Sequence, residues 1–433
     1  MPLNLSEIMN TLSVVSDSEN PQNDALHFDR YVEPLTQIIA NDITDTPFTV
    51  GVFGRWGSGK TTLMHMIEAA LEQKAATSAR EYTVVWFNPW LYQSEENLIV
   101  PLLHTIRDTL LESKVERVKG AAALVATIIA QISASALLKS VSAGSLSFED
   151  LEKRFKAQMD KRAETMSTIR TLRKQLQDVV NGVTNRGTRG RLILFIDDLD
   201  RCVPTKIVGL LEAIKLFLDL KHSVLFLAID REIVQRGIQA YYKDLNVEGS
   251  EIATLTTDYL DKMIQLPFYL HPLGPTQIQA YLTSVSEAKD VQEQAGMFST
   301  CLQPNPRKIK RVVNIYRLYR AVMERALPET ATDVERKTHR DVLAKLIVLQ
   351  QQWGDLYAAL ALNPDLAEIL ERVYRGKLAL NKTEQWAFLN GRQEAIRKLC
   401  EKFYAPGTTL EAVFKQGQTF GQVNLTDYLH MLG

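Results

Sequence analysis

A glycine-rich turn between two regular segments limits the folds open to this chain more than any other feature of its sequence. The turn, Gly54-Arg-Trp-Gly-Ser-Gly-Lys-Thr61, matches the pattern G-x-x-x-x-G-K-[ST] at every fixed position. It follows the apolar run Phe48–Phe53, typical of a buried strand, and precedes Thr61–Ala76, which has the spacing of a helix. Glycines let the backbone turn its N–H groups inward around phosphate oxygens, and the helix directs its positive end at the same anion. The sequence therefore predicts a phosphate-binding loop.

The residues of this loop differ in what they can offer a triphosphate. Lys60 is expected to reach the β- and γ-phosphates as a positive charge, and Thr61 to place its hydroxyl on Mg²⁺. The other predicted nucleotide-binding residues are Gly54, Trp56, Gly57, Ser58, Gly59 and Thr62. We expect ATP rather than GTP, because no Asn/Thr-Lys-x-Asp sequence that would select guanine follows the fourth predicted strand. Tyr31 and its neighbours are the candidates for the contact with adenine.

Three further apolar runs are typical of strands covered on both faces. They are Tyr82–Phe87, Arg191–Ile196 and Ser223–Ile229, and they alternate with helical segments at Asp29–Ala40, Ile207–Leu220 and Arg231–Tyr241. Short, continuously apolar strands that alternate with helices indicate a parallel sheet buried between helical layers. The predicted fold class is therefore α/β, with a parallel sheet and helices on both of its faces.

Acids follow the third and fourth predicted strands. Asp197 is expected to hold Mg²⁺, and Asp198 to polarise an attacking water as a general base. The alternative for either residue is an ordinary turn or helix-capping acid. Asp230, after the fourth strand, has the same two interpretations: it orients the water or senses the γ-phosphate, or it caps the next helix.

Arg201 closes the sequence Asp197-Asp-Leu-Asp-Arg201 and has two interpretations of equal weight. A cation here could reach the γ-phosphate of a neighbouring subunit and stabilise the transferring charge. It could equally pair with Asp200 in its own chain.

A long insertion, residues 95–190, separates the second strand from the third. Its segment Gly120–Leu138 contains no charged residue and approaches the length needed to span a bilayer. We expect no span, because a single crossing would place Asp197 on the opposite side of the membrane from Lys60; docking at a membrane surface or partner groove, or packing as a buried helix, are the alternatives. The charged segment Phe148–Val180 predicts a second helix, for which a solvated face is favoured over nucleic-acid binding.

Beyond Pro267 the spacing of apolar residues predicts only helices. They are expected at Gln277–Glu287, Pro306–Arg325, Glu335–Ala361, Leu366–Gly376 and Gln393–Phe403. The predicted organisation is an α/β domain formed by residues 1–94 and 191–270, a helical insertion at 95–190, and a helical region at 271–433.

Charge and cysteine content exclude some classes of protein. The 433 residues carry 50 basic and 51 acidic side chains, so no overall attraction to nucleic acid or to an anionic membrane follows. Three widely spaced cysteines form neither a disulfide framework nor a zinc signature, and the N-terminus has no secretory signal. We expect a cytoplasmic protein with reduced thiols, a peripheral position at the inner membrane being the alternative.

Four blocks of sequence resemble the KAP family of P-loop NTPases. They are Gly51–Thr61, Trp86-Phe-Asn-Pro-Trp90, Leu194–Cys202, and Asn305–Arg311 with Asn314. The resemblance implies an additional-strand ATPase core related to the AAA+ and STAND groups, with a helical lid whose sensor arginine corresponds to Arg307. A solvated arginine is the alternative for Arg307, because Lys308, Lys310 and Arg311 are its neighbours. Asn88 and Trp90 are implied to be structural or adjacent to the site, and Trp86 to belong to the core.

These features predict Mg²⁺-dependent ATP hydrolysis, with Lys60, Asp198, Arg201 and Arg307 as the catalytic residues. Asp198, Arg201 and Arg307 together favour an ATPase that assembles into a homo-oligomer. The C-terminal helical region shows no second catalytic domain, which favours a separate effector protein. The resemblance adds a hint of a role in bacterial phage defence. The alternatives are a nucleotide-binding switch with little turnover, and a scaffold anchored to a membrane or partner.

Overall fold

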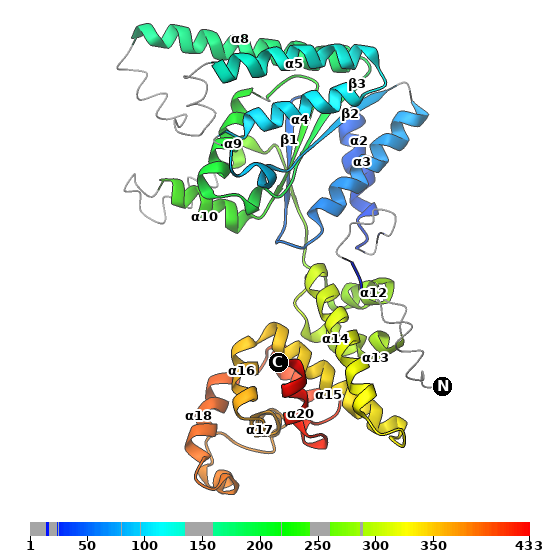
Figure 1. Cartoon of the computed structure of the whole chain (residues 1–433), viewed down its shortest axis with the longest axis vertical. Coiled ribbons are helices and arrows are strands. Elements are labelled where there is room, and N and C mark those ends of the chain that lie inside the picture. Colours follow the sequence, from blue (N-terminus) through cyan, green and yellow to red (C-terminus); the bar gives the residue numbers. More distant parts are fainter. Residues whose placement is uncertain are drawn as a thin grey trace. The chain divides into compact units, whose positions relative to one another are not determined.

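The computed structural model describes residues 14–16, 24, 26–78, 80–95, 97–134, 159–217, 219–242, 260–285 and 289–433. The chain divides into two compact units (Figure 1). One unit is Glu19–His271, and the other is Pro272–Gly433 together with the N-terminal residues through Ser18. This boundary lies next to the one predicted at residue 270, and the predicted four-part division itself stays a prediction.

The first unit is built on a five-stranded parallel sheet in the order β2-β3-β4-β1-β5. Four strands were predicted: β1 (Phe48–Phe53), β2 (Glu81–Phe87), β3 (Gly190–Ile196) and β4 (Ser223–Ile229). The fifth strand, β5 (Leu266–Tyr269), was not, so the expectation of helices alone beyond Pro267 is wrong at that point. Its four residues include a proline and are too few for a periodic pattern, and as an edge strand it pairs only with β1.

Helices cover both faces of this sheet, which confirms the predicted α/β class. Helices α2 (Asp29–Ala40) and α3 (Lys60–Thr77) lie on one face, and α9 (Pro204–Phe217) and α10 (Arg231–Tyr242) lie on the other (Figure 1). Strands β3 and β4 are buried along their whole length, as their continuously apolar sequences predict. Because all five strands are parallel, the segments that follow them emerge at one edge of the sheet.

The insertion folds into helices that extend the core on the α9 face. They are α4 (Ile99–Glu112), α5 (Glu116–Ala134) and α8 (Met159–Thr184), and α5 packs against both of the others (Figure 1). Within α5, Val125 and Ile128 are fully buried, whereas Leu124 is 45% exposed. The uncharged segment predicted at 120–138 is thus a packed helix as far as Ala134, and its residues 135–138 lie outside the described part of the chain. Residues 148–158 of the charged segment also lie outside that part. In that part, no helix combines the length and the apolar character needed to cross a bilayer.

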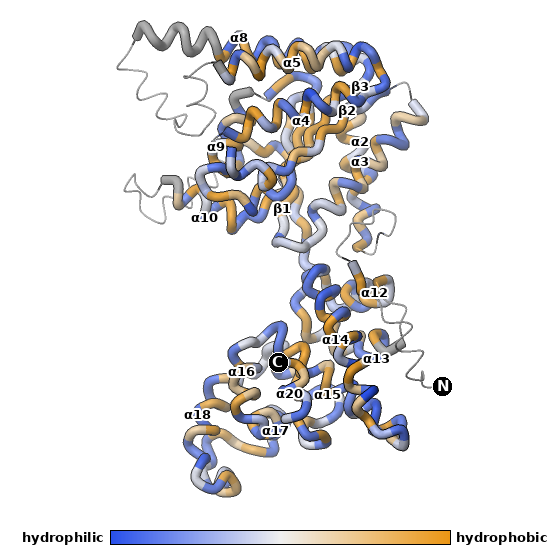
Figure 2. Tube along the Cα trace, in the orientation of Figure 1, coloured by the Kyte–Doolittle hydropathy of each residue, from blue (hydrophilic) through white to orange (hydrophobic). Residues whose placement is uncertain are grey.

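Apolar positions, orange in Figure 2, recur along both α4 and α5. The apolar residues of α5 join the same buried cluster as those of α4, α8 and the facing side of the sheet. Packing therefore accounts for the hydrophobicity of this segment.

The second unit is helical, as predicted. Its helices are α12 (Pro275–Val285), α13 (Lys289–Cys301), α14 (Pro306–Ala326), α15 (Asp333–Gln352), α16 (Gly354–Leu362), α17 (Asp365–Tyr374), α18 (Gln393–Phe403), α19 (Thr409–Lys415) and α20 (Leu425–Leu432). The single helix predicted at Glu335–Ala361 is wrong, since the backbone leaves helical geometry at Trp353 and two helices result. Helices α13, α19 and α20 were not predicted.

The three cysteines are free and buried, as expected of ordinary reduced thiols. Burial raises the pKa of Cys202, Cys301 and Cys400 to about 12 in each case, so none is held as a reactive thiolate.

Candidate nucleotide site

The phosphate loop has the backbone geometry that its sequence predicts. Gly57 and Gly59 adopt positive φ angles of 79° and 98°, which glycine reaches at little cost. A Cβ atom on Gly54 would lie 2.4 Å from the Ser58 hydroxyl, and one on Gly59 would lie 2.8 Å from the Phe28 ring. The loop is therefore packed too closely for larger residues at these positions.

The helix after the loop begins without a side-chain cap. Gly59 is the N-cap of α3, and because glycine has no side chain it makes no capping hydrogen bond to the first turn. The Ser58 hydroxyl oxygen is buried with no hydrogen-bond partner among the described residues. Uncapped helical N–H groups and an unsatisfied buried hydroxyl are the donors that an anion would satisfy.

Lys60 lies folded over the loop with its charge paired. Its Nζ donates to the Gly54 carbonyl oxygen at 2.9 Å and to Asp200 Oδ2 at 3.2 Å. The side chains of Lys60 and Asp200 are only 7% and 3% exposed. The sequence indicates Asp200 only as a partner for Arg201, and nothing in it indicates the contact of Asp200 with Lys60.

Thr61 and Asp197, the two predicted Mg²⁺ ligands, are in direct contact. The Thr61 hydroxyl donates to Asp197 Oδ2 at 2.5 Å, and Asp197 Oδ1 accepts the backbone N–H of Asp198 at 2.8 Å. Burial raises the pKa of Asp197, and the hydrogen bond from Thr61 opposes that shift. The two oxygens lie where the start of α3 meets the end of β3, which is the juxtaposition that the sequence predicted.

Asp198 is held by two residues of neighbouring segments. Asn88 Nδ2 donates to Asp198 Oδ2 at 2.9 Å, and the Arg201 guanidinium Nε lies 2.9 Å from Asp198 Oδ1. Asp198 itself has a left-handed backbone, with φ of 56°, which is uncommon outside glycine. The resemblance implies that Asn88 is structural or adjacent to the site, and its hydrogen bond to Asp198 places it adjacent to the site.

The intrachain partner predicted for Arg201 is wrong: the ion pair joins it to Asp198, not to Asp200. Residues Leu199–Arg201 form a 3₁₀ turn, in which side chains three apart lie on the same side. Asp198 and Arg201 therefore meet, and Asp200 turns inward to Lys60.

The Arg201 guanidinium also lies near two exposed indole rings. Its Cζ is 5.5 Å from the ring centre of Trp56 and 5.4 Å from that of Trp90. These rings are 56% and 44% exposed, so cation–π attraction holds Arg201 at the rim of the site. The two tryptophans lie far apart in sequence, and nothing in the sequence indicated that they share a partner.

The remaining predicted residues are less closely tied to the site. Asp230 follows β4 and its Oδ1 accepts the backbone N–H of Glu232 at 3.2 Å, as a helix-capping residue does. Thr62 lies in the first turn of α3, and Tyr31 packs edge-on to Phe268 with ring centres 5.0 Å apart. Arg307 is in the first turn of α14, in the other unit, and its assigned role stays a prediction.

Trp86 is only partly buried, so the expectation that it belongs to the core is met only in part. Its ring stacks between those of His65 and Phe195, at centre distances of 4.0 and 4.6 Å.

Comparison with known proteins assigns the fold of this site to a family. The model of the KAP family P-loop domain matches residues 28–323, more than half of the chain. The phage T7 exclusion protein of Escherichia coli (strain K12) is 23% identical in an alignment 292 residues long that covers 61% of this chain and 36% of that protein. The chain thus spans about a third of the length of this curated relative.

Among solved structures, the similarity is weak along the whole chain. The ADP form of the Aeropyrum pernix ORC2 protein is 11% identical with a TM-score of 0.41, over 98% of this chain and 96% of that one. Drosophila ORC bound to DNA is 13% identical with a TM-score of 0.40, over 94% and 83% of the two chains.

The buried pair of Lys60 and Asp200 predicts a stability effect that can be measured before any ligand is added. Asp200→Asn leaves the Lys60 ammonium buried without a counter-charge, which we expect to lower the free energy of unfolding by about 3–5 kcal/mol. In urea unfolding of the full chain, the Asp200→Asn, Lys60→Met double variant should recover at least about 1.5 kcal/mol relative to the sum of the single changes. Asp219→Asn, which breaks the surface pair with Arg173, is the matched control and should cost under about 1 kcal/mol. Strict additivity of the two single changes would show that the pair is not coupled.

Proposed function

Because this chain belongs to the KAP family of P-loop NTPases, we propose that it binds ATP with Mg²⁺ and hydrolyses the β–γ phosphoanhydride bond. One observation supports this most: Lys60 and Thr61 of the phosphate loop contact the acids that follow β3. The two segments that supply these side chains are far apart in the sequence, with 140 positions between Lys60 and Asp200. The sheet brings them together at its carboxyl edge, where ligands of open parallel sheets bind.

The residues present fit a magnesium ion. Thr61 and Asp197 supply adjacent oxygens, and Mg²⁺ usually takes one or two protein ligands, completing its shell with water and phosphate oxygens. When bound, the ion would neutralise charge on the phosphate oxygens.

The resting contacts indicate what each side chain would do on binding. Lys60 would exchange Asp200 for phosphate oxygens, while the uncapped N–H groups of α3 and the loop bind the same anion. Asp198 would accept a proton from the attacking water as the water oxygen bonds to the γ-phosphorus and ADP departs. Asn88 and Arg201 would hold the Asp198 carboxylate in position for that transfer.

The second candidate is a nucleotide-binding switch with little turnover. It is favoured by the resting network itself, in which Lys60, Thr61 and Asp198 are already paired within the chain. A nucleotide that only exchanges these contacts would change the conformation of the site without cleavage.

A turnover assay on matched variants separates these candidates. Lys60→Ala removes the phosphate-binding charge and Asp198→Asn removes the base; we expect each to lower the rate of phosphate release at least about 100-fold. Glu72→Gln, an exposed change far along α3, should leave the rate unaltered. ATP binding by the wild type without phosphate release would favour the switch, and full activity of Asp198→Asn would remove the base assigned here.

Arg201 is proposed to act within its own chain, by positioning Asp198, since its charge is already paired there. Arg201→Ala should then lower turnover about 100-fold, and mixing it with Lys60→Ala should restore no activity. A homo-oligomer is also part of the proposal, and size-exclusion chromatography of the same mixtures with ATP tests it. Recovery of activity in mixed oligomers would show instead that Arg201 reaches a neighbouring site.

At the level of process, we propose a role in phage exclusion, exerted from the cytoplasm through a separate effector protein. The support is the similarity to the phage T7 exclusion protein. Cells that express the wild type should reduce plaque formation by a T7-like phage, and cells with Lys60→Ala should not. Equal plaque numbers with both proteins, at equal expression, would separate any exclusion from nucleotide turnover.

Two further points are also proposals: nucleic acid as a partner, and the sensor role of Arg307.

A further inference from the structure

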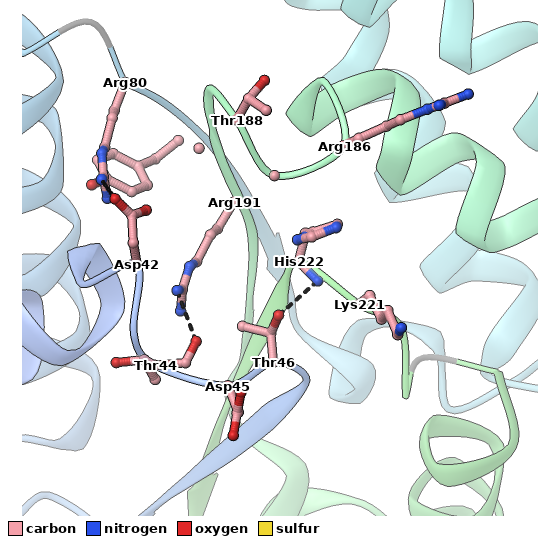
Figure 3. A pocket seen from close by; sticks show the side chains of 13 residues that line it. Asp42, Thr44, Asp45, Thr46, Arg80, Arg186, Thr188, Arg191, Lys221 and His222 are labelled. Carbon is pink, nitrogen blue, oxygen red and sulfur yellow. Dashed lines mark hydrogen bonds and ion pairs between the residues drawn. The ribbon is translucent and has the colours of Figure 1, made fainter.

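A second site lies at the amino edge of the sheet, opposite the phosphate loop. Figure 3 shows a hollow bounded by the segment before β1, the turn before β3 and the turn before β4. Its volume is about 480 Å³, within the range of small-molecule sites. Nothing in the proposed ATP chemistry uses this hollow.

The lining of this hollow is basic. It contains Arg80, Arg186, Arg191 and Lys221, against two acids, Asp42 and Asp45. Asp42 is already paired with Arg80. Three basic residues, Arg186, Arg191 and Lys221, then remain against one acid, Asp45, so positive charge exceeds negative charge in the lining.

Arg191 is the central feature. It is only 8% exposed, and its Nη2 donates to the carbonyl oxygens of Asn41 at 2.6 Å and Thr44 at 3.0 Å. Its Nη1 is buried without a hydrogen-bond partner among the described residues. Two neutral carbonyls do not balance a buried guanidinium charge, and Asp42, the acid that attracts Arg191, is shared with Arg80. Arg191 therefore adds positive charge to this edge of the sheet that the chain balances only in part.

His222 lies on the facing side of the hollow (Figure 3). Burial lowers its pKa, and the charges of Arg191 and Lys221 lower it further, which indicates a positive potential here. The ring is packed against the turn before β3, since a Cβ on Gly187 would lie 2.3 Å from His222 Nδ1. Thr46 and Thr188 also line the hollow. The Thr46 hydroxyl oxygen accepts the His222 backbone N–H at 3.0 Å, and the Thr188 hydroxyl donates to the Asn185 carbonyl oxygen at 2.7 Å.

We propose that this hollow binds a small phosphate-bearing molecule, no larger than a mononucleotide, held by the positive charges of Arg191 and Lys221. Guanidinium groups bind phosphate through charge-assisted hydrogen bonds, and a threonine hydroxyl and an imidazole can complete such a site. The concave shape of the hollow and the burial of Arg191 favour a ligand that enters the hollow over the backbone of a nucleic acid, which would contact exposed lysines and arginines.

Calorimetric titration with inorganic pyrophosphate and with AMP tests this proposal, in a Lys60→Ala background that weakens the phosphate loop. We expect both probes to bind, Arg191→Met to weaken binding about tenfold or more, and Lys221→Glu about threefold or more. Arg189→Glu is the matched control: it reverses an exposed charge on the same turn outside the hollow, and binding should be unchanged. Because Lys221 is exposed, its variant remains informative if Arg191→Met fails to fold.

Absence of binding by both probes would overturn the proposal. So would binding that Lys221→Glu leaves unchanged, since the ligand would then lie elsewhere. Binding of a short oligonucleotide, sensitive to Lys221→Glu, in the absence of binding by the small probes would replace it with a nucleic-acid contact.

Discussion

The ion pair between Lys60 and Asp200 connects the two halves of the candidate site, and most of the local structure depends on it. Burying two charges costs several kcal/mol per ion unless they pair with good geometry. The pairing requires that β1 and β3 end at the same edge, which the parallel register through β4 ensures. The phosphate loop is therefore organised before any nucleotide arrives. A bound triphosphate would compete with Asp200 for Lys60. Binding would therefore release Asp200 and rearrange the turn after β3 in the same step.

The same turn explains why the site holds its acids in distinct environments. A 3₁₀ turn places Asp198 and Arg201 on one side and directs Asp200 to the other. Asp197, at the strand end, is buried beside Thr61 and has a raised pKa, whereas Asp198 is held by Asn88 and Arg201 at the rim. Adjacent carboxylates can thus take different parts, one toward a metal ion and one toward water, because the backbone gives each a different set of neighbours.

Sequence alone predicted the parts of this molecule whose physical signal is local. The phosphate loop, the four long strands and the proximity of Thr61 to Asp197 follow from residue type and from the rule that parallel strands end together. Strand β5 could not be predicted, because four residues with a proline are ordered only by pairing with β1. The roles of Asp200, and of Trp56 and Trp90 around Arg201, depend on a three-residue turn and on contacts across the sheet edge. Packing against α4 and α8, not lipid, accounts for the described part of the uncharged segment in the insertion.

Strand β3 joins the two sites considered in this molecule. Arg191 lies near its start and Asp197 follows its end, so six residues at about 3.3 Å each place the two backbones about 20 Å apart. The strand between them is buried throughout and paired on both sides, by β2 and β4. A strand held in this way can transmit the effect of a ligand only if it has two discrete arrangements. A central strand that is paired on both sides has no second arrangement within the sheet. Any coupling between the two edges would therefore pass through the turns at the ends of β3, where the side chains that pair in the resting state can exchange partners.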